Sequence, residues 1–164
     1  MMGPLAAIRS VLTQYATFSG RAPRAEYWWF TLFAIAGGVV AGMIDMAVFG
    51  FVRIGPTSIL PFTDGLALAL FVPGIAVSVR RLHDVGLGGA FWVSLIILLQ
   101  LYSLGSAYLD QDVRTGGFSL ALALVVLGVV AVLLIQYIRP SQPGPNRFGP
   151  PPYDEALPDA EVFR

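Results

Sequence analysis

The sequence contains no cysteine, a single histidine and few charged residues. Without cysteine, the chain has no disulfide, no thiolate nucleophile and no cysteine-based metal site. Because His83 is the one histidine, carboxylates are the only other strong metal ligands, and we expect no dedicated metal site. The G-x-S-x-G, H-E-x-x-H, P-loop and G-x-G-x-x-G patterns are also missing, so we expect no catalytic site, no bound cofactor and no enzymatic activity.

The scarcity of charge excludes an ordinary soluble domain. Charged residues make up 12% of the 164 residues, against about 25% in a typical soluble domain. Hydrophobic residues make up 56%, and the mean hydropathy is +0.73. A chain of this length forms at most one domain, and it has too few charges to coat that domain in water. Its apolar surface is therefore predicted to face lipid.

Four long apolar segments predict membrane-spanning helices. Each is about 20 residues long, which suits a helix crossing a hydrocarbon core of about 30 Å. The third and fourth contain no charged residue. The connections between them are short, so neighbouring helices are expected to be antiparallel. The predicted fold is all-α, a four-helix transmembrane bundle over residues 27–138, with spans at residues 27–51, 59–79, 90–109 and 118–138.

The distribution of arginine predicts the orientation. Only Arg53 and Arg114 fall in the two loops on one side of the predicted bundle. The remaining eight fall on the other side: Arg9, Arg21, Arg24, Arg80, Arg81, Arg139, Arg147 and Arg164. Because cytoplasmic loops carry the excess of positive charge, we expect both termini and the 80–89 loop to be cytoplasmic. The chain is then a multi-pass membrane protein.

The two ends of the chain have different characters. In residues 1–26, the apolar residues Leu5, Ile8, Leu12 and Tyr15 fall at helical spacing, which favours a short amphipathic helix in the membrane interface, although a loose segment fits nearly as well. No continuous apolar core precedes residue 27, so we expect no cleavable signal peptide. In residues 139–164, a turn-rich segment of prolines and glycines precedes an acidic tail that is predicted to be disordered.

Three polar motifs accompany the predicted helices. They are FSGRAPRAEYWWF at residues 18–30, VRRLHDVGLGGAFW at residues 79–92, and PGPNRFGPPP at residues 143–152. In this order around four apolar helices, they resemble the domain of unknown function 805 (DUF805) family of YhaH-like bacterial inner-membrane proteins, over roughly residues 10–152. The resemblance implies a four-helix membrane protein and supplies no established activity.

All three motifs fall on the predicted cytoplasmic side, where their polar residues form a candidate cluster. Asp84 lies four residues after Arg80 and three after Arg81, so either arginine can pair with it on a helix. An acid at a helix C-terminus opposes the helix dipole, which suggests a further partner, Arg21 or Arg24. The candidate residues are Arg21, Arg24, Glu26, Arg80, Arg81, His83, Asp84, Asn146 and Arg147.

This cluster has two interpretations. In the first, the charges set the topology and join the rim of the bundle by ion pairs. In the second, the arginine forks bind the phosphate of a lipid headgroup or of another phosphorylated ligand. His83 fits either a hydrogen-bonded member of the loop or a proton acceptor, since its unperturbed pKa is near ~6.5.

Two acids, Asp45 and Asp64, fall within the first two spans. A carboxylate at the bilayer centre costs about 2.5–3.5 kcal/mol on insertion scales, so such residues are candidates for function. Both fall toward the outer ends of their spans, where pairing with Arg53 would make them a periplasmic ion-pair cluster. The alternative is a proton or cation relay. Pro73 is also predicted to kink the second span and to release a backbone carbonyl near Ala69.

The leading prediction is therefore a non-enzymatic inner-membrane protein with a lipid-binding or partner-binding cytoplasmic rim. The alternative is a small transporter or channel that uses Asp45 or Asp64. Expected partners are membrane lipids, anionic lipids in particular, and a second copy or another protein remains open. No nucleic-acid partner is expected.

Overall fold

The computed structural model describes residues 2–50, 60–90, 92, 94, 96–101 and 116–152. Its named helices are α1 (Pro4–Thr13), α2 (Arg24–Phe49), α3 (Pro61–Asp84) and α5 (Gly116–Ile138). Residues 96–101 are also helical. No strand occurs in this part of the chain, which confirms the all-α prediction. The predicted outer loops, apart from residues 116–117, the end of the predicted third span from residue 102 and the acidic tail from residue 153 lie outside the described residues.

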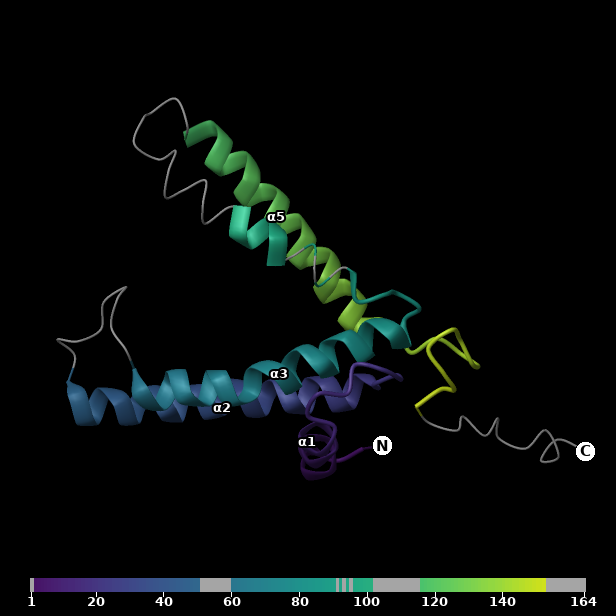
Figure 1. Cartoon of the computed structure of the whole chain (residues 1–164), viewed down its shortest axis with the longest axis horizontal. Helices are drawn as coiled ribbons and strands as arrows, with labels where there is room; N and C mark the ends of the chain where they lie inside the picture. The colour runs from purple at the N-terminus through teal and green to yellow at the C-terminus, as the bar shows by residue number, and fades with distance from the viewer. Residues whose placement is uncertain are drawn as a thin grey trace, which may run out of the picture.

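The helices form two arms that meet at one end, which we call the rim (Figure 1). Helices α2 and α3 run antiparallel along one arm, and α5 and residues 96–101 form the other. At the rim, the Tyr137 ring of α5 stacks on Tyr27 of α2, with ring centroids 4.4 Å apart. Leu82 of α3 is buried in the same contact, against Leu133 and Tyr137. Helix α5 therefore meets α2 and α3 at the rim, and a bundle closed along its whole length stays a prediction.

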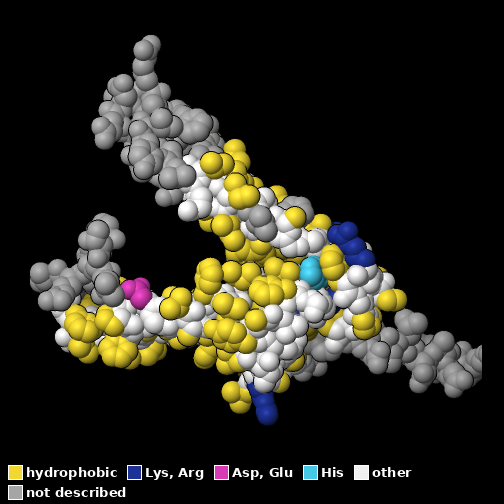
Figure 2. Space-filling view, viewed as in Figure 1, with side chains coloured by type: hydrophobic (Ala, Val, Ile, Leu, Met, Phe, Trp, Pro, Cys, Tyr) yellow, Lys and Arg dark blue, Asp and Glu magenta, His cyan; other side chains and the backbone are white. Residues whose placement is uncertain are grey.

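Helices α2 and α3 are both long and apolar enough to cross a membrane, with mean hydropathies of 2.1 and 1.8 in their most apolar windows. Their outward side chains are apolar and exposed, as at Met43 and Leu68. Hydrophobic side chains are accordingly spread over the described parts of both arms, whereas basic side chains appear toward the rim and on α1 (Figure 2). Such a surface is suited to lipid rather than to water.

Small residues bring α2 and α3 together. A Cβ added at Gly37 would lie 3.1 Å from the Leu66 side chain, and Ala41, one turn later, is buried. These two residues form a stripe that allows close helix packing. In the Gly38-x-x-x-Gly42 pattern of the sequence, only Gly42 faces α3, near Thr63, and Gly38 faces open space.

The carbonyl released by Pro73 has a partner outside α3. Proline has no N–H, so the carbonyl of Ala69, four residues earlier, loses its helical donor. The Tyr15 hydroxyl donates a hydrogen bond of 2.7 Å to this oxygen. Tyr15, in the turn after α1, thereby ties the N-terminal segment to the part of α3 that precedes Pro73.

Helix α1 packs through its smallest apolar residues. Ala7 and Val11 are buried, and Val11 joins Ala22, Phe30 and Val77 in one core. Leu5 and Leu12 of the predicted apolar face point outward, with Leu5 83% exposed. The predicted amphipathic helix therefore has an inner apolar face that the sequence analysis did not identify. Its outer apolar face remains available to the membrane interface.

Helix α3 continues past Val79, where the sequence analysis ended the second span. It stops at Asp84 in a Schellman motif, in which the N–H groups of Gly86 and Leu87 donate to the carbonyls of His83 and Leu82. Gly86 has a φ of +82°, and a Cβ there would lie 2.9 Å from the Gln142 side chain, so only glycine fits. The predicted 80–89 loop was therefore wrong for residues 80–84, which are helical.

Candidate functional site

The three polar motifs meet at the rim, where α2 begins, α3 ends and residues 139–152 return across them (Figure 1). The backbone N–H of Ala22 donates to the carbonyl of Arg80, and that of Gln142 donates to the carbonyl of Asp84, each at 3.0 Å. These two bonds fix the first and third motifs to the end of α3. The side chains between the motifs form the candidate site.

Asp84 lies between two arginines. Its Oδ1 accepts a hydrogen bond of 3.0 Å from Nε of Arg21, and its Oδ2 accepts one from Arg81. All three side chains are fully buried. Because burying a charge without a partner is costly, such a triad must be complete to be tolerated. We call Arg21, Glu26, Arg80, Arg81 and Asp84 the buried rim cluster.

The remaining donors of Arg21 and Arg81 bind backbone carbonyls of the C-terminal segment. Arg21 donates to the carbonyls of Gln142 at 2.5 Å and Gly144 at 2.7 Å. Arg81 donates to the carbonyl of Tyr137 at 3.3 Å and to that of Arg139. The last carbonyls of a helix have no helical donor, so the Arg81 guanidinium caps the C-terminus of α5.

A second buried pair connects α1 to the same cluster. Arg80 donates to Glu26 at 3.2 Å and to the side-chain oxygen of Gln14 at 2.7 Å. Ser10 of α1 donates to the same Glu26 oxygen at 3.0 Å. Nε and Nη2 of Arg80 are buried and have no acceptor within the described chain. This cation therefore depends strongly on Glu26 and Gln14.

His83, Asn146 and Arg147 form a packed corner beside the cluster. The His83 ring stacks on Phe148 with centroids 3.8 Å apart, and its Nδ1 lies 3.1 Å from the carbonyl of Gly20. Asn146 donates to the carbonyl of His83 at 3.0 Å. The Arg147 guanidinium lies over the Phe148 ring, 4.6 Å from its centroid. This geometry corresponds to the interpretation of His83 as a hydrogen-bonded structural residue.

Arg24 does not join the cluster. It is exposed, and its Nη1 donates to the carbonyl of Ile138 at 3.4 Å. Of the two further partners suggested for Asp84, the structure selects Arg21. The guanidinium of Arg24 instead borders a cavity of about 550 Å³, which we call the rim pocket. Its walls are formed by Met2, Gly3, Pro23, Arg24, Ala25, Trp29, Pro140, Ser141, Gln142, Pro151 and Pro152.

Sequence reasoning missed this pocket and the role of the N-terminal helix in the cluster. Gln14 and Ser10 carry no motif and lie outside the three recognised segments. The pocket walls are largely proline rings and backbone, drawn from four separate stretches of chain. A cavity of that kind leaves no periodic pattern in a sequence.

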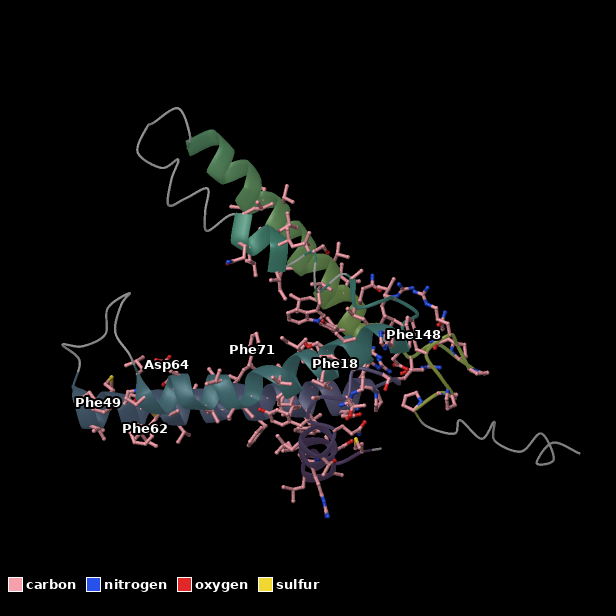
Figure 3. The ribbon with its side chains drawn as sticks, in the orientation of Figure 1. Phe18, Phe49, Phe62, Asp64, Phe71 and Phe148 are labelled. Carbon is pink, nitrogen blue, oxygen red and sulfur yellow. The ribbon has the colours of Figure 1, made fainter. Side chains whose placement is uncertain are left out.

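Asp45 and Asp64 lie at the other end of α2 and α3, far from the cluster. Figure 3 shows Asp64 and Phe62 at the end of the arm opposite to Phe148. The buried Asp45 carboxylate accepts from the N–H groups of Phe62 at 3.1 Å and Thr63 at 2.8 Å, and from the Thr63 hydroxyl at 2.7 Å. It thereby caps the start of α3. Asp64 accepts from the N–H of Leu60 at 2.9 Å. Arg53, the suggested ion-pair partner, lies outside the described residues.

Comparisons with known proteins find a matching family model and inner-membrane relatives. A family model described as "Protein of unknown function (DUF805)" matches residues 15–150. Inner membrane protein YhaH of Escherichia coli is 31% identical over 142 residues, which span 87% of this chain and 92% of YhaH. Inner membrane protein YhaI of the same organism is 41% identical over 83 residues, half of this chain and 64% of YhaI, so this match leaves over a third of YhaI uncovered. No solved structure matches the chain.

Proposed function

The chain belongs to the DUF805 family, and from this premise we propose that it is a non-enzymatic inner-membrane protein whose rim binds anionic lipid of the cytoplasmic leaflet. The family resemblance predicted from the three motifs is thereby confirmed. The proposal concerns what the rim of such a protein does. It rests on the charged side chains that remain exposed there.

Four spans with both termini in the cytoplasm are part of this proposal. Its support is that the seven arginines in the described residues all lie on α1 or at the rim. Fusions to the C-terminus test the orientation. A fused green fluorescent protein should be fluorescent and a fused alkaline phosphatase should be inactive, because only a cytoplasmic fusion gives this pair of results. A fusion placed after residue 114 should give the reverse pair. Active phosphatase at the C-terminus would refute the orientation.

The observation that carries the lipid proposal is the sign of the exposed charge. Glu26 and Asp84 are buried, so the acids at the rim within the described chain face inward. Trp28 and Trp29, each 38% exposed, lie in the first turns of α2, where the proposed topology places the headgroup region. Anionic lipids attract arginines at this position by about 1 kcal/mol each. The exposed arginines are Arg9, Arg24, Arg139 and Arg147.

The buried arginines have a different task. Arg21, Arg80 and Arg81 donate to carboxylates and carbonyls within the protein and are closed to lipid. They support the interpretation in which charges join the rim, and the exposed arginines support the interpretation in which charges meet phosphate. Replacing a buried arginine is therefore expected to destabilise the protein before it affects lipid binding.

Replacing the four exposed arginines by glutamine should remove the preference for anionic lipid. We expect the wild-type protein, purified in detergent, to bind phosphatidylglycerol more tightly than phosphatidylcholine in native mass spectrometry. The loss of about 1 kcal/mol per arginine corresponds to roughly fivefold in affinity for each residue. Thermal unfolding should change little, because these side chains are exposed.

The matched control is the double variant Arg53→Gln/Arg114→Gln, which removes the two arginines that the sequence assigns to the outer loops. It should keep the preference for phosphatidylglycerol. Equal binding of the two lipids by the wild-type protein, or an unchanged preference in the fourfold variant, would refute the proposal. Lipid binding is favoured over the transporter alternative, because the Asp45 carboxylate is occupied by three hydrogen bonds from α3 and Asp64 is exposed in the first turn of α3.

A further inference from the structure

The rim pocket has the size of a ligand site. Its volume of about 550 Å³ falls within the range of about 300–1,000 Å³ that is common for small-molecule sites. It lies between the starts of α1 and α2 and the segment that follows α5. No residue of its wall belongs to the buried rim cluster. The pocket is thus a separate feature of the rim, and its wall chemistry indicates what would fill it.

One side of the pocket attracts negative charge. Arg24 lines the pocket, and its guanidinium has one hydrogen bond within the described chain, a long one of 3.4 Å. The described residues of the wall include no acid. Two helix starts reinforce this charge, because Gly3 and Pro23, the N-caps of α1 and α2, also line the pocket. Neither helix has a side-chain cap. Their first N–H groups and positive dipole ends therefore add to the attraction for an anion.

The other side of the pocket is apolar. Trp29 is 38% exposed, and the four proline rings of the wall have no N–H to donate. A small inorganic anion would leave this surface in contact with water. An amphiphile with one anionic group uses both sides, since its phosphate meets Arg24 and its carbon chain covers Trp29.

We infer that the rim pocket binds one anionic glycerophospholipid of the cytoplasmic leaflet, with its phosphodiester at Arg24 and the two helix starts. The glycerol and the first acyl carbons lie against Trp29 and the prolines. This inference rests on the proposed function and sharpens it, because it assigns one saturable site to a lipid that exposed charge alone would attract diffusely.

The test separates the pocket from diffuse attraction. Ser141→Trp fills the pocket and changes no charge, and Arg24→Gln removes the guanidinium. Each should weaken the affinity of the tightest bound phosphatidylglycerol, measured by native mass spectrometry, by about tenfold or more. For Arg24→Gln, this is the expected effect of losing one or more charge-assisted hydrogen bonds. Pro143→Trp, on an exposed residue outside the wall, is the matched control and should bind as wild type. Arg24→Lys should restore part of the binding, since it keeps the charge and loses the fork.

A second measurement identifies the lipid directly. Phosphatidylglycerol with brominated acyl chains, diluted into phosphatidylcholine nanodiscs, should quench part of the tryptophan fluorescence. The part of the quenching that is lost in Trp29→Phe should also be lost in Arg24→Gln. Soluble glycerol phosphate should not compete at millimolar concentration. Competition by glycerol phosphate equal to that of the lipid would overturn the inference in favour of a soluble anion.

The remaining outcomes are distinguishable. Thermal unfolding should first establish that Ser141→Trp and Arg24→Gln are folded. If both keep the tight binding event while the fourfold arginine variant loses its preference for phosphatidylglycerol, the pocket inference is overturned and the proposed function stands. If the wild-type protein shows no preference for phosphatidylglycerol, both fall. Loss of the tight event in these two variants, with binding retained in Arg139→Gln/Arg147→Gln, supports the pocket.

Discussion

Replacing Asp84 with alanine should lower the free energy of unfolding by about 3–5 kcal/mol, the usual cost of removing one partner of a buried ion pair. The cost is high because Asp84 serves two guanidinium groups, Arg21 and Arg81, and all three side chains are fully buried. After the substitution, both cations keep only backbone carbonyls as acceptors. Unfolding by denaturant in detergent micelles, followed by circular dichroism, measures the change.

Two comparisons make this prediction specific. Asp64→Ala removes an exposed acid from the same helix, at its other end, and should cost about 1 kcal/mol or less, within the range for a weak cap. The double variant Arg21→Gln/Asp84→Asn should lose less than the sum of its single substitutions, because each single change leaves a buried charge unpaired. If Asp84→Ala were as stable as Asp64→Ala, the buried rim cluster would not hold the rim together.

The sequence contained part of this cluster and not the rest. The spacing of Arg81 and Asp84 on one helix indicated their pairing, and the charge of Asp84 against the helix dipole indicated a second arginine. The choice of Arg21 over Arg24 depends on where the chain enters α2, which spacing does not encode. The carbonyls of Tyr137, Gln142 and the residues near them accept hydrogen bonds through backbone atoms, which have no sequence signature.

The partner of Arg80 shows a different limit of spacing arguments. Arg80 and Asp84 are four residues apart, so they satisfy the helical pairing rule as well as Arg81 does. Arg80 instead pairs with Glu26 and Gln14, because α1 and α2 supply acceptors on its side of α3. A tertiary contact between helices outweighs a local pair that is worth about 0.2–0.5 kcal/mol.

The arrangement of the helices was predictable only in part. Hydropathy located α2, α3 and α5 because each is apolar over a membrane-spanning length. The angle between the two arms was not predictable, since α5 is apolar on every side and a lipid-facing leucine looks the same as one that faces another helix. A hydropathy profile also does not reveal contacts between stacked rings at the rim, such as the contact between Tyr27 and Tyr137.

At the opposite end of α2, two physical effects compete over Asp45. A carboxylate within a membrane span carries an insertion cost, which is largest, about 2.5–3.5 kcal/mol, at the bilayer centre. Opposing it are three hydrogen bonds that satisfy two N–H groups and one hydroxyl at the start of α3. Those donors have no alternative acceptor in hydrocarbon, where each unsatisfied group costs several kcal/mol. Because Asp45 lies toward the end of its helix, the insertion cost is reduced and the capping effect should win.

Asp45→Leu should therefore destabilise the protein by about 2–4 kcal/mol, even though leucine inserts more readily than aspartate. Asp45→Asn keeps one acceptor oxygen and should fall between leucine and wild type. Unfolding in detergent micelles gives the stability, and hydrogen exchange at the N–H groups of Phe62 and Thr63 reports the cap directly, since both should exchange faster in the leucine variant. A leucine variant more stable than wild type would mean that burying the charge destabilises the protein more than its three hydrogen bonds stabilise it. Asp45 would then have a role other than capping the start of α3.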